Sequence, residues 1–160
     1  MNINRFNFNE SQVIRIKILV DGDGSPVIKI TEEVAEKFDC KLIIFTNYAH
    51  QVESDYGQVK KLDVESQSVD MEIINTVERG DIVITQDYGL AALVLGKGAY
   101  VINNSGRKYT EENIDHLLDK RHFYAKMRRA NKRHPTYSKR TEEENEKFRN
   151  NLIKLLERCD

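Results

Sequence analysis

Residues 15–26 read RIKILVDGDGSP, and this stretch decides which kind of fold the chain adopts. Its first six residues are mostly apolar and β-branched, which is typical of a buried strand. The run stops at DGDG, where glycines and aspartates predict a turn. Ser25 and Pro26 then predict a helix start, because a capping hydroxyl often precedes a proline at the first helical position. A buried strand that leads directly into a helix begins a parallel strand–helix–strand unit.

The rest of the chain repeats this alternation of strand and helix. Apolar runs predict further strands at residues 41–46, 81–85 and 99–103, with a short strand near residues 58–62. Apolar residues at helical spacing predict helices over residues 26–38, 69–78, 88–95, 110–118 and 141–158. The T-E-E-N motif at Thr110 predicts a cap for the fourth of these helices, and the T-E-E-E motif at Thr141 predicts a capping box for the last. The pattern predicts an α/β fold with three layers, in which a doubly wound, mostly parallel sheet carries a C-terminal helical extension.

Length and composition favour a single domain. The chain has 160 residues, of which 39% are hydrophobic and 32% charged, enough for one hydrophobic core. We expect an N-terminal extension at residues 1–14, an α/β domain at residues 15–118, and a basic segment with a C-terminal helix at residues 119–160, packed on the same domain. Residues 120–140 hold nine basic and no acidic residues, whereas residues 1–119 hold 12 basic and 20 acidic ones.

Location and redox state can be predicted from the ends of the chain and its cysteines. The first fourteen residues have neither a basic start with an apolar run nor a stretch long enough to span a bilayer. Cys40 and Cys159 are far apart and have no metal-ligand spacing, which excludes a disulfide framework or a zinc site. We expect a cytoplasmic protein without a membrane partner, and nothing in the sequence indicates a homo-oligomer.

Acidic residues follow two of the predicted strands. Asp21 and Asp23 come directly after the first strand, and Asp87 follows residues 81–85 by two positions. Ligands of open α/β sheets bind outside the carboxyl ends of the strands, near the point where the strand order reverses. These three carboxylates are therefore expected at one edge of the sheet. The alternative for DGDG alone is an acidic turn that caps a helix.

Asp70 is a fourth acid with an unusual position. It shares a helix face with Ile73, Ile74 and Val77, and a carboxylate on an apolar face is costly unless it meets a cation or several donors. One interpretation is a ligand that points toward the strand ends. The other is a residue that caps the helix near Ser68 and stays in water, and the sequence leaves both open.

Four carboxylates that lie close together repel one another, and proteins usually offset this repulsion by binding a hard divalent cation. Mg²⁺ or Mn²⁺ prefers such oxygen ligands. Either ion suits phosphoryl chemistry, because it polarises a phosphodiester and lowers the pKa of a bound water.

Several motifs in order carry a resemblance to known families. The segments DGDGSPV at residues 21–27 and SVDMEIINTVERGDIVITQDYGLAALVLGKGAYVIN at residues 68–103 resemble the acidic arrangement of PIN-like nuclease domains. Together with SGRKYTEENI and the stretch from RHFYAKMRRA to KRTEEE, they are similar to the YaiI/YqxD family of uncharacterised bacterial proteins. The resemblance covers residues 15 to about 158. It implies a PIN-like fold, but the YaiI/YqxD family brings no established activity with it.

The PIN-like resemblance assigns roles to the four acids. It implies a metal-dependent nuclease in which Asp21, Asp23, Asp70 and Asp87 are catalytic, with Mg²⁺ or Mn²⁺ held by Asp21, Asp70 and Asp87. Asp23 is then a supporting acid. Ser25 departs from the pattern, because the family turn usually has cysteine there, so a mechanism that needs a thiol at this position is in doubt.

The basic stretch at residues 121–140 indicates a nucleic-acid partner. Basic residues bind phosphates, and the interspersed Phe123, Tyr124 and Tyr137 can stack on unpaired bases, so single-stranded RNA is the expected partner. The alternative is that the aromatic residues are core contacts of a helix and the charge offsets the acidic body. The predicted nucleic-acid-binding residues are Arg107, Lys108, Arg121, Lys126, Arg128, Arg129, Lys132 and Arg133.

Two other functions remain open. DGDGS after a strand is close to the nucleophile loop of haloacid-dehalogenase-like phosphatases, with Asp21 as nucleophile, Asp23 as acid/base and Thr46 in the second motif. No convincing later lysine motif accompanies it. The other alternative is a non-catalytic PIN-like module that binds RNA without cutting it.

Overall fold

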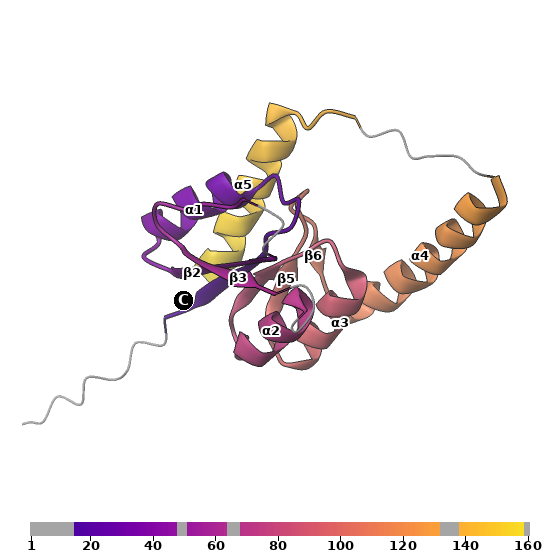
Figure 1. Cartoon of the computed structure of the whole chain (residues 1–160), viewed down its shortest axis with the longest axis horizontal. Coiled ribbons are helices and arrows are strands. Elements are labelled where there is room, and N and C mark those ends of the chain that lie inside the picture. The colour runs from indigo at the N-terminus through magenta and orange to yellow at the C-terminus, as the bar shows by residue number, and fades with distance from the viewer. Residues whose placement is uncertain (1–14, 48–50, 64–67, 132–137, 159–160) are drawn as a thin grey trace, which may run out of the picture.

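The computed structural model describes residues 15–47, 51–63, 68–131 and 138–158, and its elements alternate as the sequence predicts (Figure 1). The strands are β1 (Lys17–Asp21), β2 (Lys41–Asn47), β3 (Gln58–Leu62), β4 (Ile82–Ile84), β5 (Tyr100–Ile102) and β6 (Lys108–Tyr109). The helices are α1 (Ile28–Lys37), α2 (Val69–Thr76), α3 (Tyr88–Gly96), α4 (Glu111–Asn131) and α5 (Glu142–Arg158).

The strands form one sheet in the order β3-β2-β1-β4-β5-β6. All neighbours are parallel except β5 and β6, which are antiparallel. The predicted three-layer α/β fold with a mostly parallel sheet and a C-terminal helix is therefore confirmed. Strand β6 was not predicted, because two residues are too short to show a strand period. The sheet nevertheless ends there, with Tyr109 buried.

Two hydrophobic cores lie on opposite faces of the sheet. Ile18 and Val20 of β1 belong to the core under α1 and α5, whereas Leu19 between them belongs to the core under α2 and α3. This follows from the alternation of side chains along a strand. Full burial of a Leu or Ile side chain contributes roughly 1.5–3 kcal/mol, so a central strand buried on both faces stabilises both layers. Helices α1 and α5 lie side by side (Figure 1), joined by an ion pair between Glu33 and Arg149.

The strand order reverses between β1 and β4. From β1 the chain adds β2 and β3 on one side, and it then returns to add β4, β5 and β6 on the other. The helices that follow β1 and β4 therefore pack on opposite faces of the sheet, and the carboxyl ends of these two strands form the switch point at which open α/β sheets bind ligands. Asp21 ends β1 at this position.

The predicted helix start, with Ser25 as the cap and Pro26 as the first helical residue, is wrong by two residues. Helix α1 begins at Ile28, and its N-cap position, Val27, makes no side-chain cap. The turn before it is held by tertiary contacts, because the Gly22 amide donates to the Phe45 carbonyl at 2.8 Å. A Cβ at Gly22 would lie 2.8 Å from that same carbonyl oxygen, so only glycine allows this approach.

The other predicted caps form as expected. Thr141 and Glu144 make a reciprocal capping box at α5, with the Thr141 amide donating to Glu144 at 2.8 Å. At α4, Thr110 and Asn113 exchange hydrogen bonds of 3.2 and 3.0 Å. Each cap satisfies backbone groups that the first helical turn leaves without partners.

Helix α4 is longer than predicted, since it runs to Asn131 instead of ending at residue 118. Residues 119–131 contain no glycine or proline and are rich in Lys, Arg, Ala and Met, which favour helix. Ile114 and Leu117, in its first half, are buried against the domain. The second half extends away from the body of the protein (Figure 1).

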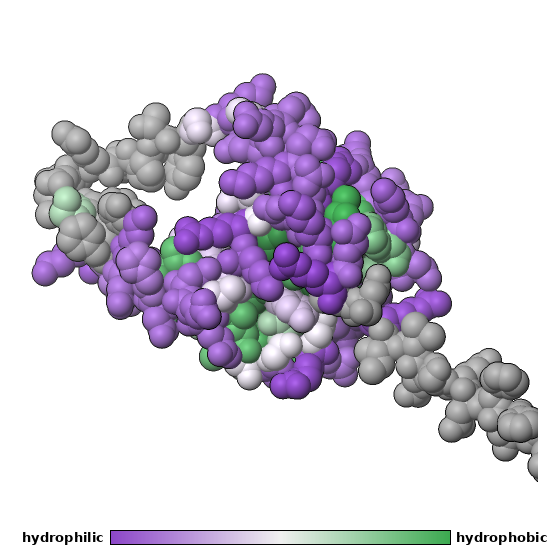
Figure 2. Space-filling view, turned by 180° about the vertical axis from the view of Figure 1, so that it is seen from behind, coloured by the Kyte–Doolittle hydropathy of each residue, from purple (hydrophilic) through white to green (hydrophobic). Residues whose placement is uncertain are grey.

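The surface is mostly polar. Figure 2 shows hydrophilic residues over most of the face seen from behind, with a small apolar area among them. In the part of the chain that the structure describes, no helix combines the length and the apolar character needed to cross a membrane.

Candidate active site at the carboxyl edge of the sheet

Asp21 lies at the centre of the acidic edge. Its half-buried carboxylate accepts a hydrogen bond of 3.0 Å from the Thr85 hydroxyl, which comes from the end of β4. Burial raises the pKa of Asp21 from its ordinary value of 3.8 to about 6; the Thr85 hydrogen bond opposes this, and the charges of Asp70, Asp23 and Asp87 add to it. The charges of all three other predicted acids therefore act on the Asp21 carboxylate.

Asp87 caps helix α3. Its Oδ1 accepts hydrogen bonds from the backbone amides of Gly89 and Leu90, at 2.8 and 3.2 Å. The backbone amide of Asp87 in turn donates to the Thr85 hydroxyl at 3.0 Å. The capping role and the partial positive charge of the helix N-terminus hold this carboxylate at the edge of the sheet.

Asp70 reaches Asp87 from helix α2. Burial raises the pKa of Asp70, as do the charge of Asp87 and a side-chain hydrogen bond with it. The N-cap of α2 is Ser68, whose hydroxyl accepts from the Met71 amide at 3.1 Å. Ser68 therefore caps α2, and Asp70 interacts with Asp87; the role of Asp70 as a metal ligand stays a prediction.

Asp23 is held against the end of β2. Its Oδ1 accepts from the Thr46 hydroxyl at 2.8 Å and from the Asn47 amide at 3.2 Å, and its Oδ2 accepts from the Asn47 side chain at 3.0 Å. Both oxygens are therefore engaged by donors. Asp23 contributes negative charge to Asp21 and fixes the turn between β1 and α1 to the neighbouring strand.

The donor chemistry of this edge suits Mg²⁺ or Mn²⁺, because every candidate ligand is a carboxylate or hydroxyl oxygen. Across residues 15–47, 51–63, 68–131 and 138–158, however, no three His, Cys, Asp or Glu side chains are already arranged around one point as metal ligands. Asp21 is engaged by Thr85 and Asp87 by α3. A cation at this edge would require these carboxylates to leave the positions that they hold here.

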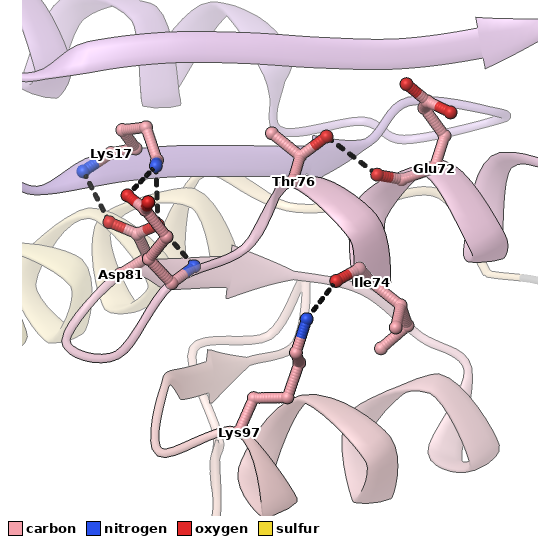
Figure 3. Close-up of polar contacts among 7 residues, drawn as sticks. Lys17, Glu72, Ile74, Thr76, Asp81 and Lys97 are labelled. Atoms are coloured by element: carbon pink, nitrogen blue, oxygen red, sulfur yellow. Dashed lines mark hydrogen bonds and ion pairs between the residues drawn. The ribbon is translucent and has the colours of Figure 1, made fainter.

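A fifth aspartate, Asp81, lies at the opposite edge of the sheet (Figure 3). It precedes β4, is 4% exposed, and accepts hydrogen bonds from the backbone amides of Lys17 and Glu78 at 3.0 and 2.8 Å. The Lys17 ammonium lies 3.3 Å from it. Burial alone lowers the pKa of Lys17, but hydrogen bonds and charges of Glu78 and Asp81 raise it overall. Asp81 is a structural residue.

The predicted nucleic-acid-binding residues lie in two places. Arg107 lies in the turn after β5 and Lys108 begins β6, at the same edge as the aspartates. Arg121, Lys126 and Arg129 are exposed on α4. The side chain of Arg128, and all of Lys132 and Arg133, lie outside what the structure describes.

The sequence interpretation missed two supporting residues and one contact. Thr85 is 1% exposed and links Asp21 to Asp87 through hydrogen bonds. Its position as the last residue of the DIVIT run was the sequence feature that could have indicated this role. Asn47 anchors Asp23, although nothing in its local sequence indicates this. Arg121 lies 3.7 Å from the Asp87 carboxylate, so it contacts the acidic edge as well as solvent.

A protein family and individual proteins of known sequence match this chain over nearly its whole length. A family model described as "Uncharacterized BCR, YaiI/YqxD family" matches residues 19–158. A "UPF0178 protein" of Clostridium tetani is 45% identical over 141 residues, which cover 88% of this chain and 97% of that protein. Another, of Alkaliphilus oremlandii, is 43% identical over 142 residues, covering 89% and 92%. No solved structure matches the chain at a significant level, so the PIN-like resemblance stays a prediction.

Proposed function

The chain belongs to the YaiI/YqxD family, and we propose that it is a divalent-metal-dependent nuclease that hydrolyses the phosphodiesters of RNA. The observation that carries this proposal is the convergence of four aspartates at the point where the strand order reverses. They come from β1, the β1–α1 turn, α2 and the N-cap of α3. These four side chains lie near enough for the charges of Asp70, Asp23 and Asp87 to act on Asp21, at the place where open α/β sheets bind their ligands.

The acids carry an electrostatic cost that a cation would relieve. Burial and the neighbouring carboxylates raise the pKa of Asp21, and Asp70 shares a hydrogen bond with Asp87. Perturbed carboxylates gathered in one crevice are a feature of functional sites, although structural networks also produce them. In this protein the carboxylates with raised pKa values, Asp21 and Asp70, are among those that the sequence resemblance assigns to metal binding.

Each residue has a distinct role in the proposal. Asp21, Asp70 and Asp87 would hold Mg²⁺ or Mn²⁺, which would polarise the phosphodiester of the substrate and lower the pKa of a bound water. Thr85 orients Asp21 and keeps the end of β4 close to it, with both of its hydrogen bonds at 3.0 Å. Asp23 holds the turn in place through Thr46 and Asn47.

A haloacid-dehalogenase-like phosphatase fits these contacts less well. That reaction needs Asp23 as a mobile acid/base and a hydroxyl from Thr46 for the phosphate. Here the Thr46 hydroxyl donates to Asp23, and both oxygens of Asp23 are already engaged. The arrangement suits a positioning role for Asp23 better than proton transfer.

Calorimetric titration of Mn²⁺ into the metal-free protein tests the proposal. We expect the native protein to bind Mn²⁺ and Asp21→Asn and Asp87→Asn to lose binding, because each removes a negatively charged ligand. Asparagine caps helices as well as aspartate does, so Asp87→Asn leaves α3 capped. Asp115→Asn, which changes an exposed carboxylate on α4, is the control and should bind normally.

Cleavage of labelled single-stranded RNA follows the binding measurement. We expect cleavage that requires Mn²⁺ or Mg²⁺ and disappears in Asp21→Asn. Neutralising Arg128 and Arg129 together should weaken RNA binding and flatten its salt dependence. A native protein that binds no metal would remove the basis of the nuclease proposal. Metal-independent RNA binding without cleavage would instead identify a non-catalytic module.

A further inference from the structure

A second concave site lies beside the acidic edge, between the β5–β6 turn and helix α5. It has a volume of about 440 Å³. Ile102 and Leu155 supply apolar wall, and Asn151 supplies an amide. The remaining side chains are mainly cations from the turn and from one face of α5: Arg107, Lys108, Lys147, Lys154 and Arg158.

Direct contacts between the turn and the helix build this pocket. The Asn151 side chain donates to the Gly106 carbonyl at 2.9 Å. Gly106 has φ +85°, and a Cβ there would lie 3.0 Å from the Lys147 carbonyl oxygen, so the turn touches the backbone of α5. Arg140 donates to the Asn104 carbonyl at 2.6 Å and ties the turn to the start of α5. The pocket therefore has fixed walls on both sides.

The charge of the pocket is not compensated by neighbouring acids. No acidic residue lines it, and within the described residues none of its five cations forms an ion pair. Some cations elsewhere in the protein do form ion pairs: Lys17 with Glu78 and Asp81, Lys60 with Glu72, and Arg149 with Glu33. The Lys108 ammonium lies 5.0 Å from the centre of the Tyr100 ring, but no acid among the described residues neutralises it. Five cations without an ion pair around one cavity repel one another, and an anionic ligand would relieve that repulsion.

We infer that this pocket binds backbone phosphates of an RNA chain, away from the bond that is cut. The inference rests on the proposed function, because RNA is the substrate class of that proposal. Arg supplies paired donors that match phosphate oxygens, and lysine ammonium groups supply further charge. Nothing in the lining resembles an enclosing base pocket, since the apolar part of the wall is limited to Ile102, Leu155 and aliphatic stems.

The sheet topology places the pocket and the aspartates at the same edge of the sheet. Asp21 ends β1, and the β5–β6 turn follows β5, two strands away along the same edge. With neighbouring strands spaced about 4.8 Å apart, this separation is roughly 10 Å. The pocket opens on the α5 side of the sheet, so a strand of RNA that crosses the edge can contact both places.

Fluorescence anisotropy with a labelled oligouridylate of about 12 nucleotides, within the usual site sizes of single-strand-binding proteins, tests this inference. The metal is removed with a chelator, so binding is measured without cleavage. We expect Lys147→Gln with Lys154→Gln to reduce the salt slope by about 1.4, since each lost phosphate contact removes about 0.7. At 0.1 M salt this corresponds to roughly 25-fold weaker binding.

The control is Lys37→Gln with Lys41→Gln, which removes the same charge from exposed positions on the far side of α1 and at the start of β2. This control should bind as the native protein does, and circular dichroism should show both double variants folded. Equal losses in the two double variants would overturn the inference, because they would show only a general charge effect.

Competitors identify the chemistry of the ligand. Inorganic phosphate, uridine monophosphate and polyglutamate should each displace the oligouridylate far more weakly than unlabelled oligouridylate does. Displacement by the mononucleotide or by polyglutamate as effective as that by the RNA chain would overturn the assignment to RNA. Because Asp21→Asn should still bind RNA through the pocket, loss of metal binding and loss of this pocket are separate outcomes.

Discussion

Replacing Asp21 with asparagine should stabilise the folded protein at neutral and alkaline pH. Burial raises the pKa of Asp21 from 3.8 to about 6, so the folded state holds its negative charge less readily than the unfolded chain. At 1.36 kcal/mol for each pKa unit, this difference corresponds to roughly 3 kcal/mol. Asp21 is only partly buried, and solvent screening brings the expected gain in unfolding free energy to about 1–2 kcal/mol.

The sign and the pH range of this effect follow from the two pKa values. Below 3.8 the carboxyl is protonated in both states and contributes no difference, whereas above about 6 it is charged in both and the folded state bears the full cost. The advantage of Asp21→Asn should therefore be largest at pH 8 and about half as large at pH 5. Asparagine can still accept the Thr85 hydrogen bond, so the structure is kept.

Urea unfolding of the native protein, Asp21→Asn and the control Asp115→Asn at both pH values measures this effect. Mn²⁺ at 100 times its dissociation constant should stabilise the native protein by about 2.7 kcal/mol and leave Asp21→Asn unchanged, which reverses their order. The reasoning would be refuted if Asp21→Asn were less stable than the native protein at pH 8, or if the difference did not change with pH.

Three further substitutions separate the roles of the surrounding residues. Thr85→Val removes the hydroxyl that joins Asp21 to the Asp87 amide. Urea unfolding should therefore show an unfolding free energy lower by about 1–3 kcal/mol. Mn²⁺ titrations of this variant should show binding that begins at a higher pH than in the native protein. Asp81→Asn should also cost about 1–3 kcal/mol, because the Glu78 amide loses its acceptor, but Mn²⁺ affinity should be unchanged at this opposite edge. Gly106→Ala should destabilise the protein by more than the 1–2 kcal/mol of backbone strain alone, whereas Gly80→Ala, with φ +86° and open space, should show only the strain by the same measurement.

The local pattern of the chain was sufficient to predict most of its elements. The mostly apolar, β-branched run at β1 predicted a buried strand, and the motifs at Thr110 and Thr141 predicted helix caps that form. These signals work because they depend on neighbours within a few residues. Strand β6 has no comparable signal, since Lys108 and Tyr109 form a strand only by pairing with β5.

Tertiary contacts decided the points that the local pattern predicted wrongly or left open. Ser25 does not cap α1, because the Gly22 amide binds the Phe45 carbonyl and fixes the preceding turn. The sequence left two interpretations open for Asp70, and in the structure Ser68 caps α2 while Asp70 interacts with Asp87. Both outcomes depend on residues that lie well apart along the chain.

By itself the sequence determined the fold class, the caps and the presence of acids after two strands. Only the tertiary structure decided which strand ends are neighbours, and so which acids meet. Thr85 donates to Asp21 across 64 residues, and Asn151 reaches Gly106 across 45. The strength of such a contact depends on distance in space, whereas a sequence pattern reports only separation along the chain. The acidic edge and the basic pocket therefore both arise from the order of the strands.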